Sequence, residues 1–478
     1  MAGLGFDFDI TARGVRLSVF GYDEKLTDFV SLLATAVTSF DMENPYQINS
    51  SKNDAEFETS EQTFERQREL LRRELESFDT NQPYQHCKYW EATITERPHY
   101  SKEALRSSLE RATLSKVAAH ARFIWQDTTS SHLSNRALGK ALLQGNLSPS
   151  DAAAIFSTLE NELVWKAGPI LDDESAGNKL GKRWALLPTK RCALVPTFDE
   201  MLNMGYIAQL PSINAGRYPT IVRPPFDVRN INSAVEFVWQ IPETQNAFFE
   251  AHESVLSKNG LQSSVSEELP CTWQQWAATA DVYGTLLEQP VFESLRTKQQ
   301  LGYIVFSGIR NADGVRSFVI IVQSSKYSAS ELHECVANFM EGLEDGFLAS
   351  LTSEDVKRTA SGLVEKKLVR EKRLVTQVGR HWDEIISGTF EWDRAATEAD
   401  ALRKVDLKSI LAFHRTFVSP RSHLRRVIAY HVNANVGSMG SQKTQSPSMK
   451  MAPILDTTEF STSLSLLPVR DIEARELK

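Results

Sequence analysis

The chain has few of the residues that mark several common protein classes. Its 478 residues include only four cysteines, and none forms a Cys-x-x-Cys pair, so neither a zinc ribbon nor a disulfide framework is predicted. No apolar run approaches the roughly 18 residues that a membrane span requires. The N-terminus has no basic region followed by an apolar core, as a secretory signal would. We therefore expect a cytoplasmic protein with no membrane partner.

Positive charge and metal-ligand patterns are also scarce. The net charge is −8, which argues against a nucleic-acid partner because phosphate recognition needs clustered positive charge. The ten histidines include neither His-Glu-x-x-His nor His-x-x-Glu-His, the helical patterns that hold catalytic zinc. His381, Asp383 and Glu384 lie close in sequence, but polar residues on a helix surface explain them better than metal ligands do. No tight zinc site is expected in this chain.

The same plan of strands and helices is predicted twice. VRLSVF at 15–20 precedes a helical apolar stripe from Leu26 to Val37, and FVIIV at 318–322 precedes a stripe with the same spacings from Leu332 to Leu343. A long charged helix follows in each copy. Each copy is expected to close with a further helix and a short strand, near 139–144 and 426–432. Spacing alone leaves a duplication open, since many α+β domains share such stripes.

The two copies differ in what precedes them. More than a hundred residues precede the strand of the second copy, whereas about fourteen precede that of the first. We expect a fragment of a longer product or a misplaced start, with an exposed sheet edge and apolar face. The predicted fold is α+β, with two related modules whose mainly antiparallel sheets are covered by helices on one side. The domains are a truncated module at 1–185, a complete module at 186–432, and a flexible connection and tail at 433–478.

The segment LRTKQQLGYIVFSG at 295–308 is the main candidate site. Pro290 suits the first turn of a helix, Gly302 ends that helix through left-handed or close-approach geometry, and a β-prone run follows. Arg296 and Tyr303 should therefore lie near one junction. A guanidinium and a phenol are suitable donors to hold a peptide carbonyl and stabilise charge on its oxygen. The alternative is a packed turn with a half-buried tyrosine.

This string resembles the C-terminal half of insulysin-type enzymes, the inverted zinc metallopeptidases that include pitrilysin. Other segments resemble the family in family order: GVRLSVFGY at 14–22, NQPYQHCKYW at 81–90, ALLQGN at 141–146, HWDEIISGTFEWDR at 381–394 and TTEF at 457–460. The resemblance covers most of the chain and is weakest at 198–214. It implies that Arg296 and Tyr303 reach across a closed chamber and assist catalysis. It also implies zinc in the complete family enzyme, in the half that this chain does not contain.

A basic cluster forms a second candidate site, comprising Lys366, Lys367, Arg370, Lys372 and Arg373. Most such runs are solvated faces. The string LVREKRL at 368–374 is similar to the insulysin segment that contacts polyanions such as nucleotide phosphates, so the resemblance implies a weak polyanion site. The acidic residue inside the run, Glu371, departs from that pattern.

Two functions stay open at this point. In the first, the chain is the zinc-free half of an insulysin-like metalloendopeptidase, inactive alone, which encloses peptide substrates together with an N-terminal catalytic half, covalent or separate. A homodimer of the complete enzyme would be compatible with this. In the second, the chain is a free-standing, non-catalytic module that binds peptides or a partner subunit, or an inactive fragment. The presence of both Arg296 and Tyr303 favours the first.

Overall fold

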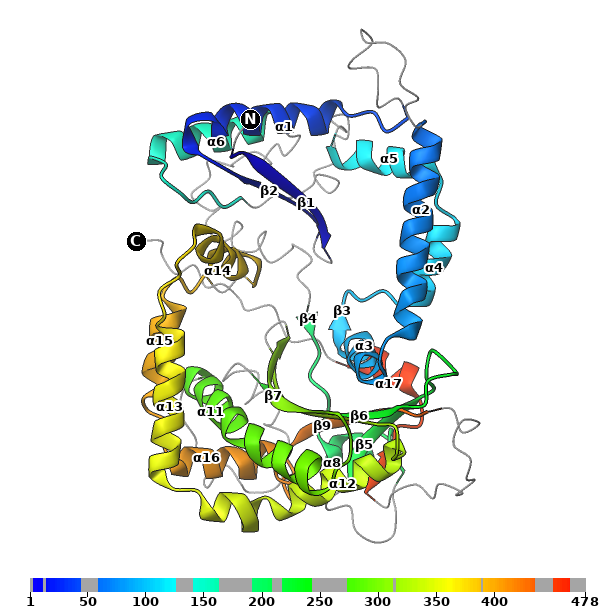
Figure 1. The fold of residues 1–478 in the computed structure, drawn as a ribbon, viewed down its shortest axis with the longest axis vertical. Coiled ribbons are helices and arrows are strands. Elements are labelled where there is room, and N and C mark those ends of the chain that lie inside the picture. Colours follow the sequence, from blue (N-terminus) through cyan, green and yellow to red (C-terminus); the bar gives the residue numbers. More distant parts are fainter. Residues whose placement is uncertain are drawn as a thin grey trace.

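Figure 1 shows the computed structural model of the chain, in which two groups of elements lie at opposite ends of an elongated molecule. Helices α2 and α4 connect the groups along one side, and α13, α14 and α15 rise from the lower group along the other. The structure describes residues 3–11, 14–43, 59–125, 141–162, 191–208, 217–242, 273–312, 315–387, 390–434 and 450–464.

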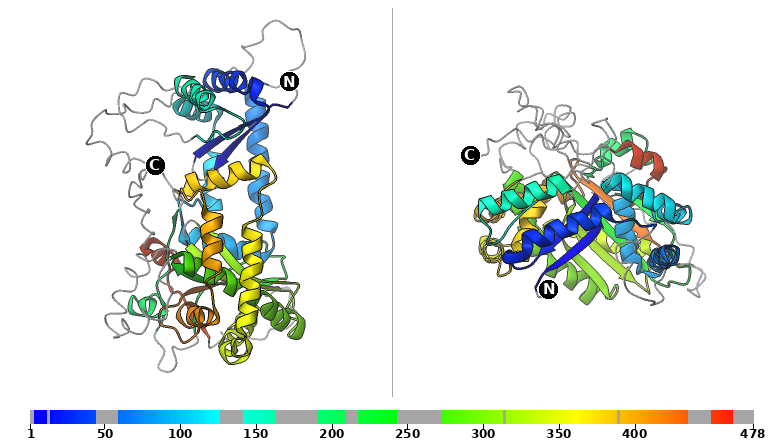
Figure 2. Two further views of the ribbon diagram at one scale, coloured as in Figure 1. Left: turned by 90° about the vertical axis from the view of Figure 1, so that its left-hand side faces the viewer. Right: turned by 90° about the horizontal axis from the view of Figure 1, so that it is seen from above.

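The first group begins with a hairpin and continues with helices. Its elements are β1 (Gly5–Thr11), β2 (Gly14–Phe20), α1 (Leu26–Ser39), α2 (Ser60–Ser77), α3 (Pro83–Thr95), β3 (Glu96–Arg97), α4 (Lys102–Glu110), α5 (Leu114–Trp125) and α6 (Pro149–Glu162), with 3₁₀ turns η1 (Asp23–Lys25) and η3 (Phe78–Thr80). Helices α1 and α6 lie side by side over the hairpin (Figures 1 and 2).

The second group contains the main sheet. Its strands are β4 (Arg191–Cys192), β5 (Tyr218–Arg223), β6 (Ser233–Pro242), β7 (Ile304–Ala312), β8 (Val315–Ser324), β9 (Arg426–Val432) and β10 (Met451–Pro453). Its helices are α8 (Phe198–Asn203), α11 (Trp273–Val291), α12 (Ala329–Gly342), α13 (Ser353–Lys367), α14 (Leu374–Ser387), α15 (Arg394–Leu402), α16 (Leu407–Phe413) and α17 (Thr457–Ser463). Three π-helical segments, η6 (Phe292–Lys298), η7 (Glu344–Leu348) and η8 (His414–Val418), continue α11, α12 and α16.

The main sheet has six strands in the order β10-β5-β9-β6-β8-β7. Strands β10, β5 and β9 run parallel, whereas the β9-β6, β6-β8 and β8-β7 pairs are antiparallel. Strand β8, the predicted FVIIV strand, is buried at all ten positions, as expected for a strand covered on both faces. The α+β class with mainly antiparallel pairing is therefore confirmed.

The repeated plan is visible in the order of elements. The hairpin β1-β2 is followed by α1 and the long α2, and the hairpin β7-β8 is followed by α12 and the long α13. The predicted capping box at the start of α13 is present, because Thr352 and Asp355 each bond the backbone N–H of the other. Of the strand predicted near 139–144, residues 141–144 form no strand, and the rest lies outside the described ranges.

Helices cover both faces of the main sheet. The sequence predicts helices on one side, and the larger core lies between one face of the sheet and α11, α12, α13 and α16. A second core lies on the opposite face, where α3 packs on β6 and β9 together with residues of α8 and α17. Helix α3 follows the first hairpin in sequence, so this second cover joins the two groups. Cys87 and Ile94 of α3 are almost completely buried there.

Part of the predicted connection and tail belongs to the sheet. Within the predicted segment 433–478, residues 451–453 form β10, which pairs in parallel with β5. Helix α17 follows and buries Phe460 completely in the second core. Within the predicted connection and tail, residues 450–464 are therefore held by a sheet edge and a core on which their apolar side chains pack. Residues 435–449 and 465–478, like the predicted domain boundary at 185, lie outside the described part.

The hairpin β1-β2 exposes an apolar face. Phe6, Phe8 and Ile10 occupy every second position of β1 and so lie on one side of it, and each side chain is about half exposed or more. Helix α1 covers this face in part, with the rings of Phe6 and Phe29 6.4 Å apart. Neither strand pairs with a further strand in the described residues. This agrees with the predicted exposed sheet edge and apolar face. None of the described helices is long and apolar enough to span a membrane.

A buried charge cluster lies where α3 meets the sheet. Arg310 of β7 bridges Glu91 of α3 at 2.6 Å and Glu236 of β6 at 2.7 Å, through the same Nη2 atom. Burial, followed by repulsion from Glu236, raises the pKa of Glu91 to about 8. Burial also raises the pKa of Glu236, although Arg310 opposes that shift. The two carboxyl groups therefore hold a proton at neutral pH.

The raised pKa of Glu91 predicts that the contribution of this residue to stability falls as pH rises. The folded chain keeps a proton that the unfolded chain releases above pH 4.5, so the stabilising contribution is complete below pH 4.5 and is lost as pH approaches 8. Glu91→Gln mimics the protonated form. Between pH 4.5 and 8, the melting temperature of the unsubstituted chain should therefore drop relative to that of Glu91→Gln, as followed by circular dichroism.

The exposed Glu74→Gln on α2 is the matched control and should leave the pH slope unchanged. Equal slopes for the unsubstituted chain and Glu91→Gln would contradict the proton-holding pair.

Candidate functional site

The candidate site begins at the end of α11, where the helix widens. The sequence predicts Pro290 in a first helical turn, but it lies inside the last turn of α11, so that prediction is wrong. Helix α11 is already formed well before Pro290, and its side chains Ala280, Tyr283 and Leu287 are buried in the larger core. Proline removes one backbone hydrogen bond and crowds the carbonyl four residues earlier. The π-helix η6 starts two residues later, and its wider turn suits such a break.

The loop after η6 is fixed by buried leucines and by a close backbone approach. Leu295 and Leu301 are buried, and the Leu301 N–H donates to the Leu295 carbonyl at 3.0 Å. Gln300 takes the left-handed conformation with φ of 51°. Gly302 lies against β8 so closely that a Cβ would clash with the carbonyl of Gln323. Of the two roles predicted for Gly302, close approach is therefore the one observed.

The structure brings Arg296 and Tyr303 together at this junction, as the sequence predicts. The guanidinium of Arg296 lies 4.8 Å from the ring centre of Tyr303 and 5.3 Å from that of Phe292. Arg296 Nη1 also donates to the carbonyls of Gly302, at 3.4 Å, and Tyr303. Sequence reasoning missed Phe292, although its position four residues before Arg296 on a helix was a usable signal.

The side chains of Tyr303 and Arg296 differ in how exposed they are and in which of their polar atoms are already hydrogen-bonded. Tyr303 is 83% exposed, and its hydroxyl makes no hydrogen bond with any residue that the structure describes. Arg296 is half-buried and uses one nitrogen on the loop backbone, while its aromatic contacts fix the guanidinium plane. The arrangement presents a phenol donor to solvent beside a fixed positive charge. Such a pair can bind the oxygen of a peptide carbonyl.

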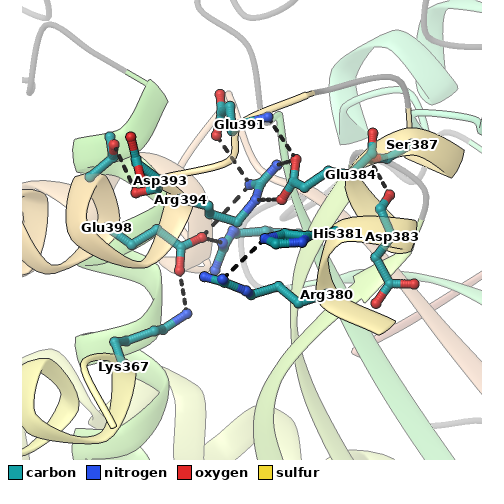
Figure 3. Close-up of polar contacts among 12 residues, drawn as sticks. Lys367, Arg380, His381, Asp383, Glu384, Ser387, Glu391, Asp393, Arg394 and Glu398 are labelled. Carbon is teal, nitrogen blue, oxygen red and sulfur yellow. Dashed lines mark hydrogen bonds and ion pairs between the residues drawn. The ribbon is translucent and has the colours of Figure 1, made fainter. Parts of the chain in front are cut away.

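His381 and Glu384 have structural partners (Figure 3). Glu384 is buried and accepts from the Arg394 guanidinium, with Nη2 at 3.0 Å, and from the Glu391 N–H at 3.0 Å. His381 Nδ1 lies 2.8 Å from Oε1 of Gln144, so this residue links α14 to the segment before α6. No three His, Cys, Asp or Glu side chains converge as a metal site in the described ranges. This donor set does not fit the zinc of the family enzymes.

The basic cluster divides into an inward and an outward part. Lys367 bonds Glu398 at 2.5 Å and lies 3.8 Å from Asp281 (Figure 3 shows the Glu398 contact). Arg316 of β8 contacts the same two carboxylates, at 2.5 Å from Asp281 and 3.6 Å from Glu398. Lys367 is therefore part of a network that fastens α13 and α15 to α11.

The other four cationic side chains are exposed on and after α13: Lys366, Arg370, Lys372 and Arg373. Glu371 pairs with Arg380 of α14 at 3.0 Å. That pair removes much of the repulsion that an unpaired Glu371 would exert on an anion.

Comparison with known proteins supplies the family. Residues 1–108 match the model described as the middle or third domain of peptidase_M16, and residues 282–382 match PQQ synthase PqqF-like, C-terminal lobe domain 4. Human insulin-degrading enzyme is 25% identical over 488 aligned residues, which cover 98% of this chain. These matches support the insulysin and pitrilysin family, peptidase M16, as the family of this chain. Both matched domains belong to the C-terminal half of such proteins.

Other relatives agree with this placement. A nardilysin-like protein of Arabidopsis thaliana is 30% identical over 191 residues, covering 40% of this chain and 18% of the relative. The crystal structure of pitrilysin superposes with a TM-score of 0.63 at 13% identity, over 98% of this chain and 40% of pitrilysin, which supports the fold. The chain spans about two fifths of the length of the insulin-degrading enzymes that it matches, 39% in the human case. Arg296, Tyr303 and the basic cluster all lie inside the matched range 282–382.

The close backbone approach at Gly302 predicts that Gly302→Ala destabilises the chain. The added Cβ would meet the backbone carbonyl of Gln323, which cannot move without disturbing β8. We expect a loss of about 1–3 kcal/mol in the free energy of unfolding, measured by urea denaturation.

Gly362→Ala, inside α13 with open space around it, is the control and should be neutral or stabilising. Equal stability of Gly302→Ala and the unsubstituted chain would contradict the constraint at Gly302.

Proposed function

We propose that this chain is the C-terminal half of an insulysin-like zinc metalloendopeptidase and assists peptide hydrolysis in a chamber shared with an N-terminal catalytic half. The observation that carries the proposal is the Arg296–Tyr303 pair, which combines an exposed phenol and a fixed guanidinium inside the range that matches the C-terminal lobe domain. The metal of the family would be held by the other half. No step of the proposal runs through a metal on this chain.

The two residues have separate roles in this proposal. Tyr303 donates a hydrogen bond from its phenol to the oxygen of the scissile carbonyl, where negative charge develops during hydrolysis. Arg296 positions the Tyr303 ring through its stacking contact and its bonds to the loop carbonyls. Its positive charge, beside the same ring, further stabilises an anionic oxygen. Groups that are placed before the reaction need little reorganisation during it.

One observation keeps the non-catalytic alternative open. Nη1 of Arg296 donates to the carbonyls of Gly302 and Tyr303. A turn with a purely structural role would also need these hydrogen bonds. A module that binds peptides or a partner subunit without cleaving them would show the same contacts. Activity measurements distinguish the two.

The proposal predicts that Tyr303→Phe and Arg296→Lys each lower kcat/KM for peptide cleavage. The assay uses the purified chain mixed with a separately expressed N-terminal half of a family enzyme, with insulin B chain as substrate. The expected loss is about 1–4 kcal/mol of transition-state stabilisation for each variant, mostly in kcat. Lys298→Ala is the control, because Lys298 is exposed and its ion pair is with the neighbouring Glu293.

The outcomes separate the two functions. Cleavage only in the mixture, reduced by both variants, supports the catalytic half. Binding of insulin B chain without cleavage in the mixture supports the non-catalytic module. Unchanged kcat/KM in both variants contradicts the roles of Arg296 and Tyr303, and zinc-dependent cleavage by this chain alone contradicts the division of labour.

We further propose a weak polyanion site at Lys366, Arg370, Lys372 and Arg373. These four exposed cations are close in sequence, at the end of α13 and just after it, and their acidic neighbour Glu371 is paired with Arg380. Lys367 belonged to this cluster in the sequence, but its contacts with Glu398 and Asp281 remove it from the binding set. Clustered cations attract phosphate groups without a dedicated loop.

The site predicts that Lys372→Ala/Arg373→Ala weakens binding of inorganic triphosphate, measured by calorimetry at low salt. Loss of two exposed cations should lower affinity about tenfold, and added salt should reduce the difference. Lys357→Ala/Arg358→Ala removes the same charge from the other end of α13 and is the control. Equal weakening by both pairs would show a general charge effect and contradict a site.

A further inference from the structure

The candidate site continues into an open sheet edge. Strand β7 is the last strand of the six-stranded sheet and pairs with β8 alone among the described residues. The pairing runs through nine consecutive residues, from Ile304 with Gln323 to Ala312 with Val315, without a bulge. Backbone N–H and C=O groups of alternate residues on such a strand point away from the sheet and have no partner within it. Ser307 and Gly308 in the middle of β7 are buried, whereas Phe306 and Asn311 are exposed.

The two edges of the sheet differ in how they are protected. The opposite edge, β10, has only three residues and ends at Pro453, which cannot donate a backbone hydrogen bond. Short strands and proline are common protections of an edge. Strand β7 extends for about 30 Å and contains no proline or lysine. Its one charged residue, Arg310, is engaged with Glu91 and Glu236.

Exposed aromatic side chains lie beside the open edge. Val305 and Ile309 of β7 pack against the larger core. Phe306 lies on the opposite face, because side chains alternate along a strand, and it is 53% exposed. The Phe306 ring extends over Gly308, where an added Cβ would lie 3.3 Å from it. The exposed ring of Tyr303 stands just before the strand.

We propose that the edge of β7 binds an extended peptide segment as an added strand, with an apolar side chain of the peptide packed on Phe306. A peptide backbone is the partner whose donors and acceptors repeat at the spacing of a strand edge. The proposal rests on the proposed function and deepens it. A peptide paired with β7 would reach the phenol of Tyr303 at the start of the strand, so pairing would set which carbonyl meets Tyr303.

N-methylation of the peptide tests the pairing directly. The probe is a fluorescein-labelled decapeptide of alternating Val and Thr with a lysine at each end, and its binding is followed by anisotropy. N-methyl groups placed one residue at a time should weaken binding with a period of two, by about fivefold or more at every second position. Uniform weakening, or none at any position, would overturn strand pairing.

A substitution on the protein tests the location. Phe306→Lys places a charged, edge-protecting side chain beside β7 and should weaken decapeptide binding about tenfold. Phe20→Lys in the β1-β2 hairpin is the matched control, since Phe20 is 54% exposed, and it should have no effect. Phe306→Leu keeps an apolar surface and should restore most of the binding, which separates loss of docking from loss of folding.

The readouts distinguish this inference from the proposed function. If insulin B chain is cleaved in the two-half mixture with unchanged KM in Phe306→Lys, the edge inference fails and the proposed function stands. If the decapeptide binds with the period of two but no cleavage occurs in the mixture, the edge inference stands and the catalytic role fails. Sedimentation that shows dimers of the chain, abolished by Phe306→Lys, would assign the edge to a second copy and overturn the proposal.

Discussion

Helix α3 is the contact on which the arrangement of the chain depends. It follows the first hairpin and α2 in sequence, yet it buries Cys87 and Ile94 against β6 and β9 of the second group. Without it, one face of the main sheet would lose much of its apolar cover, because the remaining cover comes from the short helices α8 and α17. Burial of this kind is the main favourable contribution to folding. The helix therefore fixes the first group on the second.

The same helix is connected to the candidate site through Gln323. The side chain of Gln323 accepts from the Tyr84 N–H at 3.1 Å and donates to Gln82 at 2.8 Å, both at the start of α3. The backbone carbonyl of Gln323 is the group that excludes a side chain at Gly302. One residue of β8 thus contacts both the joining helix and the loop that carries Tyr303. Rigid attachment is what a site needs if it is to act on a substrate that another half also holds.

Local signals in the sequence predicted much of the fold. Apolar stripes gave α1 and α12, Thr352 with Asp355 gave the start of α13, and the FVIIV run gave β8. Each depends on residues that are near in sequence. The second cover by α3, the pairing of β10 with β5, and the bridge from Glu91 to Arg310 depend on packing between distant segments, which no local pattern encodes. The prediction that Pro290 lies in a first helical turn was wrong for a related reason, since the buried stripe of α11 overrides that local preference of proline.

At the site, the proximity of Arg296 and Tyr303 was predictable from their short separation in sequence. The inward position of Lys367 was not predictable in this way, because it depends on the distant partners Asp281 and Glu398.

The position of β10 has a consequence for synthesis of the chain. Strands β5, β6, β7, β8 and β9 are complete once residue 432 has been made, but the edge of β5 that residues 451–453 cover is still open at that stage. A ribosome-bound chain that has folded these five strands would therefore expose the edge of β5, in addition to that of β7, until β10 leaves the exit tunnel. Exposed edges of this kind pair readily with other chains. Slow translation across the segment before β10 would lengthen that vulnerable interval, so chaperones should matter most before β10 emerges.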